Sequence, residues 1–209
     1  SVDSKSLLLK IKENKERREN GIFNSIPFPF PRLSKIFSGF EKGHIINITS
    51  GTGQGKTTVG KYLTVFKMYE FFKNNGYKGK IFYFALEESE VDFWASVYSY
   101  LLAAHYKIKL KPNQILSKGE WKLSNQHFQL LESLASIIDD MKNYIEIVDF
   151  LYNPTSFKVY IDTFFDNPEI LTHIYKEIVE DGRTLRIKVG YEYKDPNASY
   201  IVVYYHINL

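Results

Sequence analysis

The stretch ITSGTGQGKTTVGKYL, residues 48–63, places alternating glycines and then Lys56 between an apolar run and a helical pattern. The run, HIINITS (44–50), lies between two glycines, and a short apolar run with such borders predicts a buried strand. After Lys56, apolar residues recur at helical spacing as far as residue 74, where NNGYKG ends the pattern. The sequence therefore predicts a strand, a glycine turn and a helix in that order.

This glycine turn has the residue types that hold a nucleotide phosphate. Such a loop needs a small residue at the strand end, backbone N–H groups around the phosphates, a lysine and a hydroxyl for magnesium. We assign nine consecutive residues to the binding of ATP or another NTP, with the Thr57 hydroxyl as the Mg²⁺ ligand: Ser50, Gly51, Thr52, Gly53, Gln54, Gly55, Lys56, Thr57 and Thr58. Ser50 replaces the usual first glycine, but serine is also small. The alternative is a glycine-rich turn without a ligand.

A second strand, KIFYFALEE (80–88), ends in two carboxylates. Hydrolysis of a nucleotide needs a carboxylate that orients or deprotonates water, and the tip of a neighbouring strand is a suitable place for it. Because side chains alternate along a strand, only one of the two can face the nucleotide. We predict Glu87 as the catalytic residue and expect Glu88 to be solvated or paired with a lysine. The alternative is that both are only a polar strand end.

Strands and helices alternate along much of the remaining chain. Ser89 and Asp92 resemble a capping box before a helix. A helix over 124–141 and a strand over 144–150 follow, and this alternation predicts an α/β fold with a mainly parallel sheet flanked by helices. Residues 172–194 resemble a hairpin with its turn at Asp181 and Gly182. The chain ends on a predicted strand, YIVVYYHINL (200–209), so we expect a domain that is incomplete at its C-terminus.

Two parts are predicted along the chain. Residues 1–24 form an N-terminal arm, a short amphipathic helix that needs a partner surface for its leucines. The segment SIPFPFPRL follows as an extended connector, because its prolines exclude a helix and a central strand. Residues 25–209 form the domain that contains the glycine turn.

Composition excludes several classes of site. The chain has 209 residues and no cysteine, which excludes disulfides and cysteine-bound metal. No apolar run approaches the length of a membrane helix, and the first residues do not form a signal peptide. We therefore expect a cytoplasmic protein without a membrane partner. A formal net charge of +3 is too small to indicate nucleic-acid binding by itself.

The motifs together resemble a known family. ITSGTGQGKTT followed by FYFALEES is similar to the first two motifs of the DnaB-like, ring-shaped replicative DNA helicases, particularly their bacteriophage branch. The segment IPFPFPRLSKIFSGFEKGHI resembles the stretch before the loop in that family, and YIVVYYHINL resembles its Walker B strand. The resemblance covers roughly residues 25–209. It implies a RecA-like P-loop NTPase core, a hexamer, and NTP hydrolysis coupled to translocation on single-stranded DNA.

By the same resemblance, Lys56 binds the phosphates, Thr57 ligates Mg²⁺ and Glu87 activates water, while the arm corresponds to a linker helix that packs on a neighbouring subunit. Tyr205 stands where the family has the Walker B aspartate, and a phenol cannot replace a carboxylate near Mg²⁺. Asp149, also at a predicted strand end, is a rival partner for the metal. The family's DNA-binding loops and arginine finger lie beyond the region of resemblance, so we expect this chain alone to be nearly inactive.

Three hypotheses follow from the sequence. The first is the ATP-binding portion of a replicative helicase. The second is a degenerate RecA-like module that binds a nucleotide or a partner without helicase activity, because Tyr205 has replaced the aspartate. The third is a RecA-fold ATPase of recombination or signalling.

Overall fold

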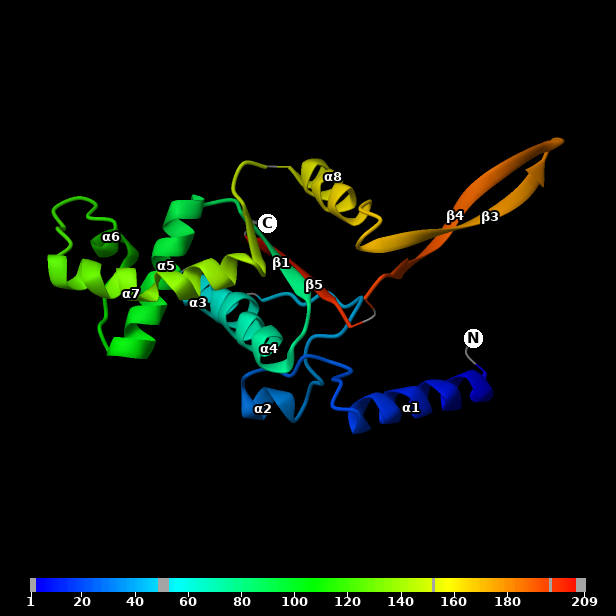
Figure 1. Ribbon diagram of the computed structural model, residues 1–209, viewed down its shortest axis with the longest axis horizontal. Helices are drawn as coiled ribbons and strands as arrows, with labels where there is room; N and C mark the ends of the chain where they lie inside the picture. Colours follow the sequence, from blue (N-terminus) through cyan, green and yellow to red (C-terminus); the bar gives the residue numbers. More distant parts are fainter. Residues whose placement is uncertain (1–2, 49–52, 152, 196, 206–209) are drawn as a thin grey trace. The chain divides into compact units, whose positions relative to one another are not determined.

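The computed structural model describes residues 3–48, 53–151, 153–195 and 197–205 (Figure 1). The chain divides into two compact units, residues 1–74 and 75–209. The expected boundary between an arm (1–24) and a domain (25–209) is a different division, and it stays a prediction.

The first unit begins with the predicted arm helix. Helix α1 (Ser4–Glu19) is capped by the Asp3 carboxylate, which accepts a hydrogen bond from the Ser6 backbone N–H at 2.8 Å. None of its residues is buried, as expected for a helix that lacks a covering surface. The connector has only the short helix α2 (Pro31–Ser34) and an isolated antiparallel bridge between Ile26 and Phe40.

The strand predicted over 44–50 is wrong for its described part. Residues 44–48 form no strand, and the Ile45 side chain is 90% exposed. The prediction assumed that an apolar run is buried, but a strand also needs a neighbour that accepts its backbone hydrogen bonds. Residues 44–48 lie in the first unit, whereas the parallel sheet lies in the second.

The predicted helix after the glycine turn is confirmed. It consists of α3 (Lys56–Lys61), a π-helical segment η1 (Tyr62–Phe66) and α4 (Lys67–Asn75). Spacing alone did not predict the π-helical segment. Its Thr64 hydroxyl donates to the Gly60 carbonyl at 2.8 Å, one turn back along the helix.

The second unit contains a three-stranded parallel sheet, which confirms the α/β fold class. Its strands are β1 (Gly79–Ala85), β2 (Ile145–Val148) and β5 (Ser199–Tyr205), in the spatial order β2-β1-β5. Both pairings are parallel, with Phe84 opposite Val148 on one side and Tyr204 on the other. The predicted strands over 80–88, 144–150 and 200–209 are thus found over the described residues, with shorter bounds.

Alternate residues of β1 point to opposite faces of the sheet, and residues on both faces are buried. Helices therefore cover both faces. On one face, Phe84 packs 4.7 Å from Phe157 of α8 (Pro154–Phe165), measured between ring centroids. On the other face, Tyr83 packs 4.7 Å from Phe93 of α5 (Glu90–Tyr106). Helix α7 (Asn125–Lys142), predicted over 124–141, contacts α5 and β2, and the short α6 (Pro112–Ile115) contacts α5.

The predicted hairpin is also confirmed. Strands β3 (Leu171–Glu180) and β4 (Arg183–Tyr193) pair in a long antiparallel ribbon (Figure 1). Its turn lies at Asp181 and Gly182, whose φ angles of +50° and +73° suit a two-residue hairpin turn. The register shifts between Ile174 and Tyr175, which marks a bulge in the ribbon.

Candidate functional site

The glycine turn has a backbone that only glycine adopts easily. Gly53 and Gly55 have φ angles of +75° and +77°, in the left-handed region where a Cβ atom is unfavourable. Gly55 is the N-cap of α3, and its carbonyl accepts the first helical hydrogen bond from the Val59 N–H at 2.9 Å. The two glycines therefore turn the chain directly into a helix, as a phosphate-binding loop requires.

The predicted phosphate and metal ligands that the structure describes lie at the start of this helix. Lys56 is half-buried at the first position of α3, and Thr57 and Thr58 are exposed in the same turn. Gln54 lies between the two left-handed glycines and is exposed. Three predicted ligands lie outside the described residues: Ser50, Gly51 and Thr52.

The two carboxylates after β1 have different surroundings. Glu88 is half-buried and accepts a hydrogen bond from the Tyr83 hydroxyl at 3.2 Å, so a tyrosine holds it. Glu87 is exposed. The Tyr83 hydroxyl is a partner that the expectation for Glu88, solvated or paired with a lysine, did not include, and the catalytic role of Glu87 stays a prediction.

Asp149, the rival metal partner, caps a helix. Its carboxylate accepts a hydrogen bond from the Glu90 backbone N–H at 2.8 Å, at the first residue of α5. The Ser89 hydroxyl accepts from the Asp92 N–H at 3.2 Å and donates to the Asp92 carboxylate at 2.8 Å, which confirms the predicted cap. The hydrogen bond from the Lys118 ammonium is the largest cause that holds the pKa of the Asp92 carboxyl below its usual value. The hydrogen bond from the Ser89 hydroxyl lowers this pKa further.

The end of β5 lies beside the acidic end of β1. In the parallel register Tyr205 is opposite Ala85, two residues before Glu87. Because β2 flanks β1 on its other side, Asp149 also lies at this edge of the sheet. The carboxyl ends of parallel strands are a common place for ligand sites in α/β folds. The structure thus brings three of the discussed positions to one edge, whereas the glycine turn belongs to the other unit.

Sequence reasoning missed a groove beside β2. This open hollow of about 590 Å³ is lined by residues of α8 together with Glu146 and Leu151. Glu146 accepts a hydrogen bond from the Tyr160 hydroxyl and lies 3.5 Å from the Lys80 ammonium. Burial and the Glu146 carboxylate raise the pKa of Tyr160 to about 12. Helix α8 itself was not predicted, although Asn153 before Pro154 is a helix start signal.

Within the described residues there is no group of three or more acidic or histidine side chains that could hold a metal ion. Among those same residues, no helix combines the length and apolar character needed to span a bilayer. Comparison of the chain with models of protein families, with curated proteins and with solved structures found no match.

Proposed function

We propose that the chain is the nucleotide-binding portion of a P-loop NTPase with a RecA-like core, of the type found in ring-shaped replicative DNA helicases. The observation that carries this proposal is the pair of left-handed glycines, Gly53 and Gly55, that leads directly into a helix beginning at Lys56. A turn of this kind presents several backbone N–H groups to one anion, and the helix N-terminus adds its dipole. The parallel sheet of the second unit is compatible with such a core.

In this proposal the ammonium of Lys56 binds the outer phosphates and the hydroxyl of Thr57 binds magnesium. Mg²⁺, when bound, would neutralise charge that develops on the phosphates. Glu87 accepts the proton of the attacking water, so that the water oxygen bonds to the γ-phosphorus as the bond from that phosphorus to the bridging oxygen of the leaving nucleoside diphosphate breaks. By the resemblance, hydrolysis would drive movement along single-stranded DNA by a cytoplasmic homo-oligomer, a hexamer.

A second candidate function is a nucleotide-binding or partner-binding module that does not hydrolyse. Tyr205 supports it, because this residue ends the strand that lies beside β1. A carboxylate at this position would help to place Mg²⁺ through its water shell, and a phenol would not.

The test is the affinity for a fluorescent ATP analogue, measured with and without Mg²⁺. We expect Lys56→Ala to weaken binding at least tenfold, because one charge-assisted contact with phosphate is lost. Lys73→Ala, in α4 of the same helical segment, is the matched control and should leave the affinity unchanged. Equal affinities for all three proteins would refute nucleotide binding at the glycine turn.

Two further variants separate the candidate functions. Glu87→Gln should keep the affinity for the analogue and lower any steady-state hydrolysis. If Tyr205→Asp increases Mg²⁺-dependent binding, the end of β5 can place Mg²⁺ once it carries a carboxylate, as a Walker B strand does. If Tyr205→Asp has no effect on binding while Lys56→Ala abolishes it, the chain binds nucleotide without a Walker B function.

A further inference from the structure

The β3–β4 ribbon has two chemically different faces. Residues directly opposite in an antiparallel pair share a face, and alternate residues change face. The pairs His173–Tyr191, Tyr175–Lys188, Glu177–Arg186 and Val179–Thr184 therefore form one face, which we call the aromatic face. The opposite face, here the aliphatic face, is formed by Ile174, Lys176, Ile178, Arg183, Leu185 and Ile187 together with Thr172, Glu180, Gly190 and Glu192.

On the aromatic face, two cations of β4 lie beside the rings of His173, Tyr175 and Tyr191. The Arg186 guanidinium carbon lies 4.1 Å from the centroid of the Tyr175 ring. The rings of His173 and Tyr175 are 6.3 Å apart, and Tyr191 lies 5.4 Å from Tyr193 at the ribbon base. Tyr175 is 43% exposed and Tyr191 is 58% exposed, so both rings present surface to a ligand.

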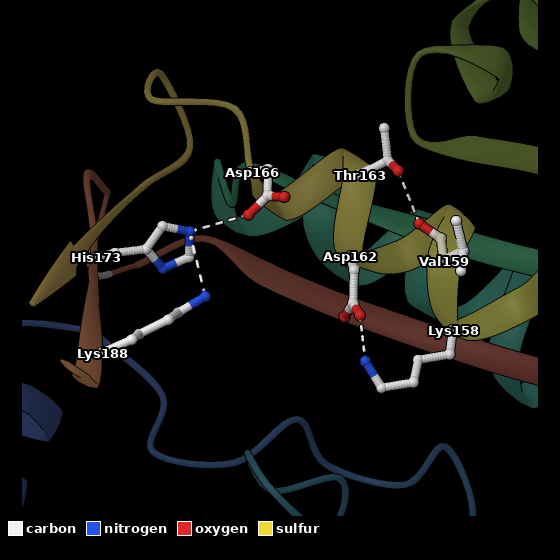
Figure 2. Close-up of polar contacts among 7 residues, drawn as sticks. All are labelled: Lys158, Val159, Asp162, Thr163, Asp166, His173 and Lys188. Carbon is white, nitrogen blue, oxygen red and sulfur yellow. Dashed lines mark hydrogen bonds and ion pairs between the residues drawn. The ribbon is translucent and has the colours of Figure 1, made fainter. Parts of the chain in front are cut away.

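The ribbon is held firmly where it joins the rest of its unit. Tyr193 stacks on Tyr200 of β5 at 5.6 Å, and Phe165 at the end of α8 lies 5.0 Å from Tyr200. Figure 2 shows Asp166 and Lys188 both directed at the His173 ring, whose Nε2 is 3.0 Å from the Asp166 carboxylate and 3.4 Å from the Lys188 ammonium. These contacts fix the base of the ribbon while its outer residues stay exposed.

The charges of the aromatic face suit a polyanion. Arg186 and Lys188 are exposed cations on β4, and Glu177 is the acidic residue among the eight that define the face. The acidic residues of the tip, Glu180 and Asp181, lie on the aliphatic face and in the turn. Exposed rings interleaved with cations are the surface on which the bases of a single strand stack while its phosphates meet the cations.

We propose that the aromatic face binds single-stranded nucleic acid. Bases stack on Tyr191 and on the Tyr175–Arg186 pair, and phosphates contact Lys188 and the free edge of the Arg186 guanidinium. A protein partner would fit the aliphatic face better, because Ile178, Leu185 and Ile187 form an apolar group there and the centre of a protein interface is the most apolar part of it. This surface includes none of the glycine-turn residues and needs no nucleotide.

The test is fluorescence anisotropy of a labelled 20-nucleotide oligo-dT, titrated with the full chain without any triphosphate. Tyr175→Ala with Tyr191→Ala should weaken binding about tenfold or more, because each lost stacking contact weakens binding several-fold. The pair Tyr175→Phe and Tyr191→Phe keeps the rings and should retain most of the affinity. Arg186→Gln with Lys188→Gln should reduce the slope of log K against log salt by about 1.4, that is, about 0.7 for each lost contact.

The matched control is Lys176→Gln with Arg183→Gln, which removes the same charge from the aliphatic face. It should change the affinity less than threefold. The proposal is overturned if this control weakens binding as much as the aromatic-face pair, if the alanine variants bind like the parent chain, or if no binding is measured. It is also overturned if the alanine variants only abolish self-association in sedimentation, since the occupant would then be a second copy. Failure of ATP binding at Lys56 affects none of these titrations, so the two proposals fail separately.

Discussion

Gly55 shows how a single residue can determine a turn through its backbone angle. Among the described residues, a Cβ atom added at Gly53 or Gly55 would meet no atom within 4 Å, so the space left by that part of the chain does not demand glycine there. The φ of +77° does, because a left-handed conformation costs an L-residue about 1–2 kcal/mol. We predict that Gly55→Ala lowers the free energy of unfolding by about that amount, measured by urea denaturation.

Gly55→Asn is the matched variant for this prediction. Asparagine adopts the left-handed region more easily than alanine, so Gly55→Asn should be less destabilising although its side chain is larger. If alanine were tolerated as well as asparagine, the turn would not depend on the left-handed angle. The left-handed φ of Gly55 would then no longer support a phosphate-binding loop.

Single-residue rules were sufficient where the partners are close in sequence. Ser89 and Asp92 cap a helix as predicted, because the cap is made within three residues. The partner of Glu88 could not be predicted in the same way. Its hydrogen bond from Tyr83 depends on how the chain turns after β1, which no local pattern describes. The hydrogen bond that Asp149 accepts from Glu90 could not be predicted either, since the two residues are 59 positions apart in the sequence.

At the scale of elements, α8 contributes to stability through the phenylalanine that it buries on the sheet. Phe157 is 5% exposed and packs with Phe82, Phe84 and Val148. We predict that Phe157→Ala lowers the free energy of unfolding by about 3–5 kcal/mol, because it removes buried apolar surface and leaves a cavity. The measurement is chemical denaturation followed by far-UV circular dichroism.

Phe150 provides a control of the same residue type in the same unit. It is 59% exposed, so Phe150→Ala should cost less than about 1 kcal/mol. A loss at Phe157 no larger than the loss at Phe150 would contradict the packing of α8 on the sheet.

Elements were predictable when their pattern was long or closed by a clear turn. The helix from Lys56, the helix over 124–141 and the ribbon with its Asp181–Gly182 turn are all present. The strand predicted over 44–50 is absent over its described residues. The prediction rested only on apolar character, whereas the pairing of a strand depends on residues far away in the sequence. The sheet order β2-β1-β5 could not be deduced for the same reason, since periodicity specifies faces and not neighbours.

At the scale of the whole molecule, the division into units is the feature that the sequence did not indicate. The chain divides near residue 74, at the end of the helical pattern, whereas we predicted a boundary before the proline connector. Proline and glycine mark local breaks in secondary structure, while a compact unit is defined by long-range packing. The glycine turn and Glu87 therefore belong to different units although only some thirty residues separate them.

Because the chain has two units, nucleotide binding at the glycine turn should raise the unfolding temperature of the unit that contains it. A ligand that binds only the folded protein stabilises it by about 2.7 kcal/mol when present at 100 times its Kd. For a unit of 74 residues that corresponds to a rise of about 10–20 °C in the midpoint of its thermal unfolding. We predict this rise with Mg-ATP by scanning calorimetry, in the transition of the unit that contains Lys56.

Lys56→Ala should show a rise at most about half as large, because a variant that binds tenfold more weakly is stabilised by only about 1.4 kcal/mol at the same concentration of Mg-ATP. Lys73→Ala should respond as the parent chain does, since its substitution lies in α4, well beyond the glycine turn. An equal rise in the Lys56→Ala variant would place the ligand elsewhere on the molecule. A rise confined to a transition of residues 75–209 would do the same, because the glycine turn is not part of that unit.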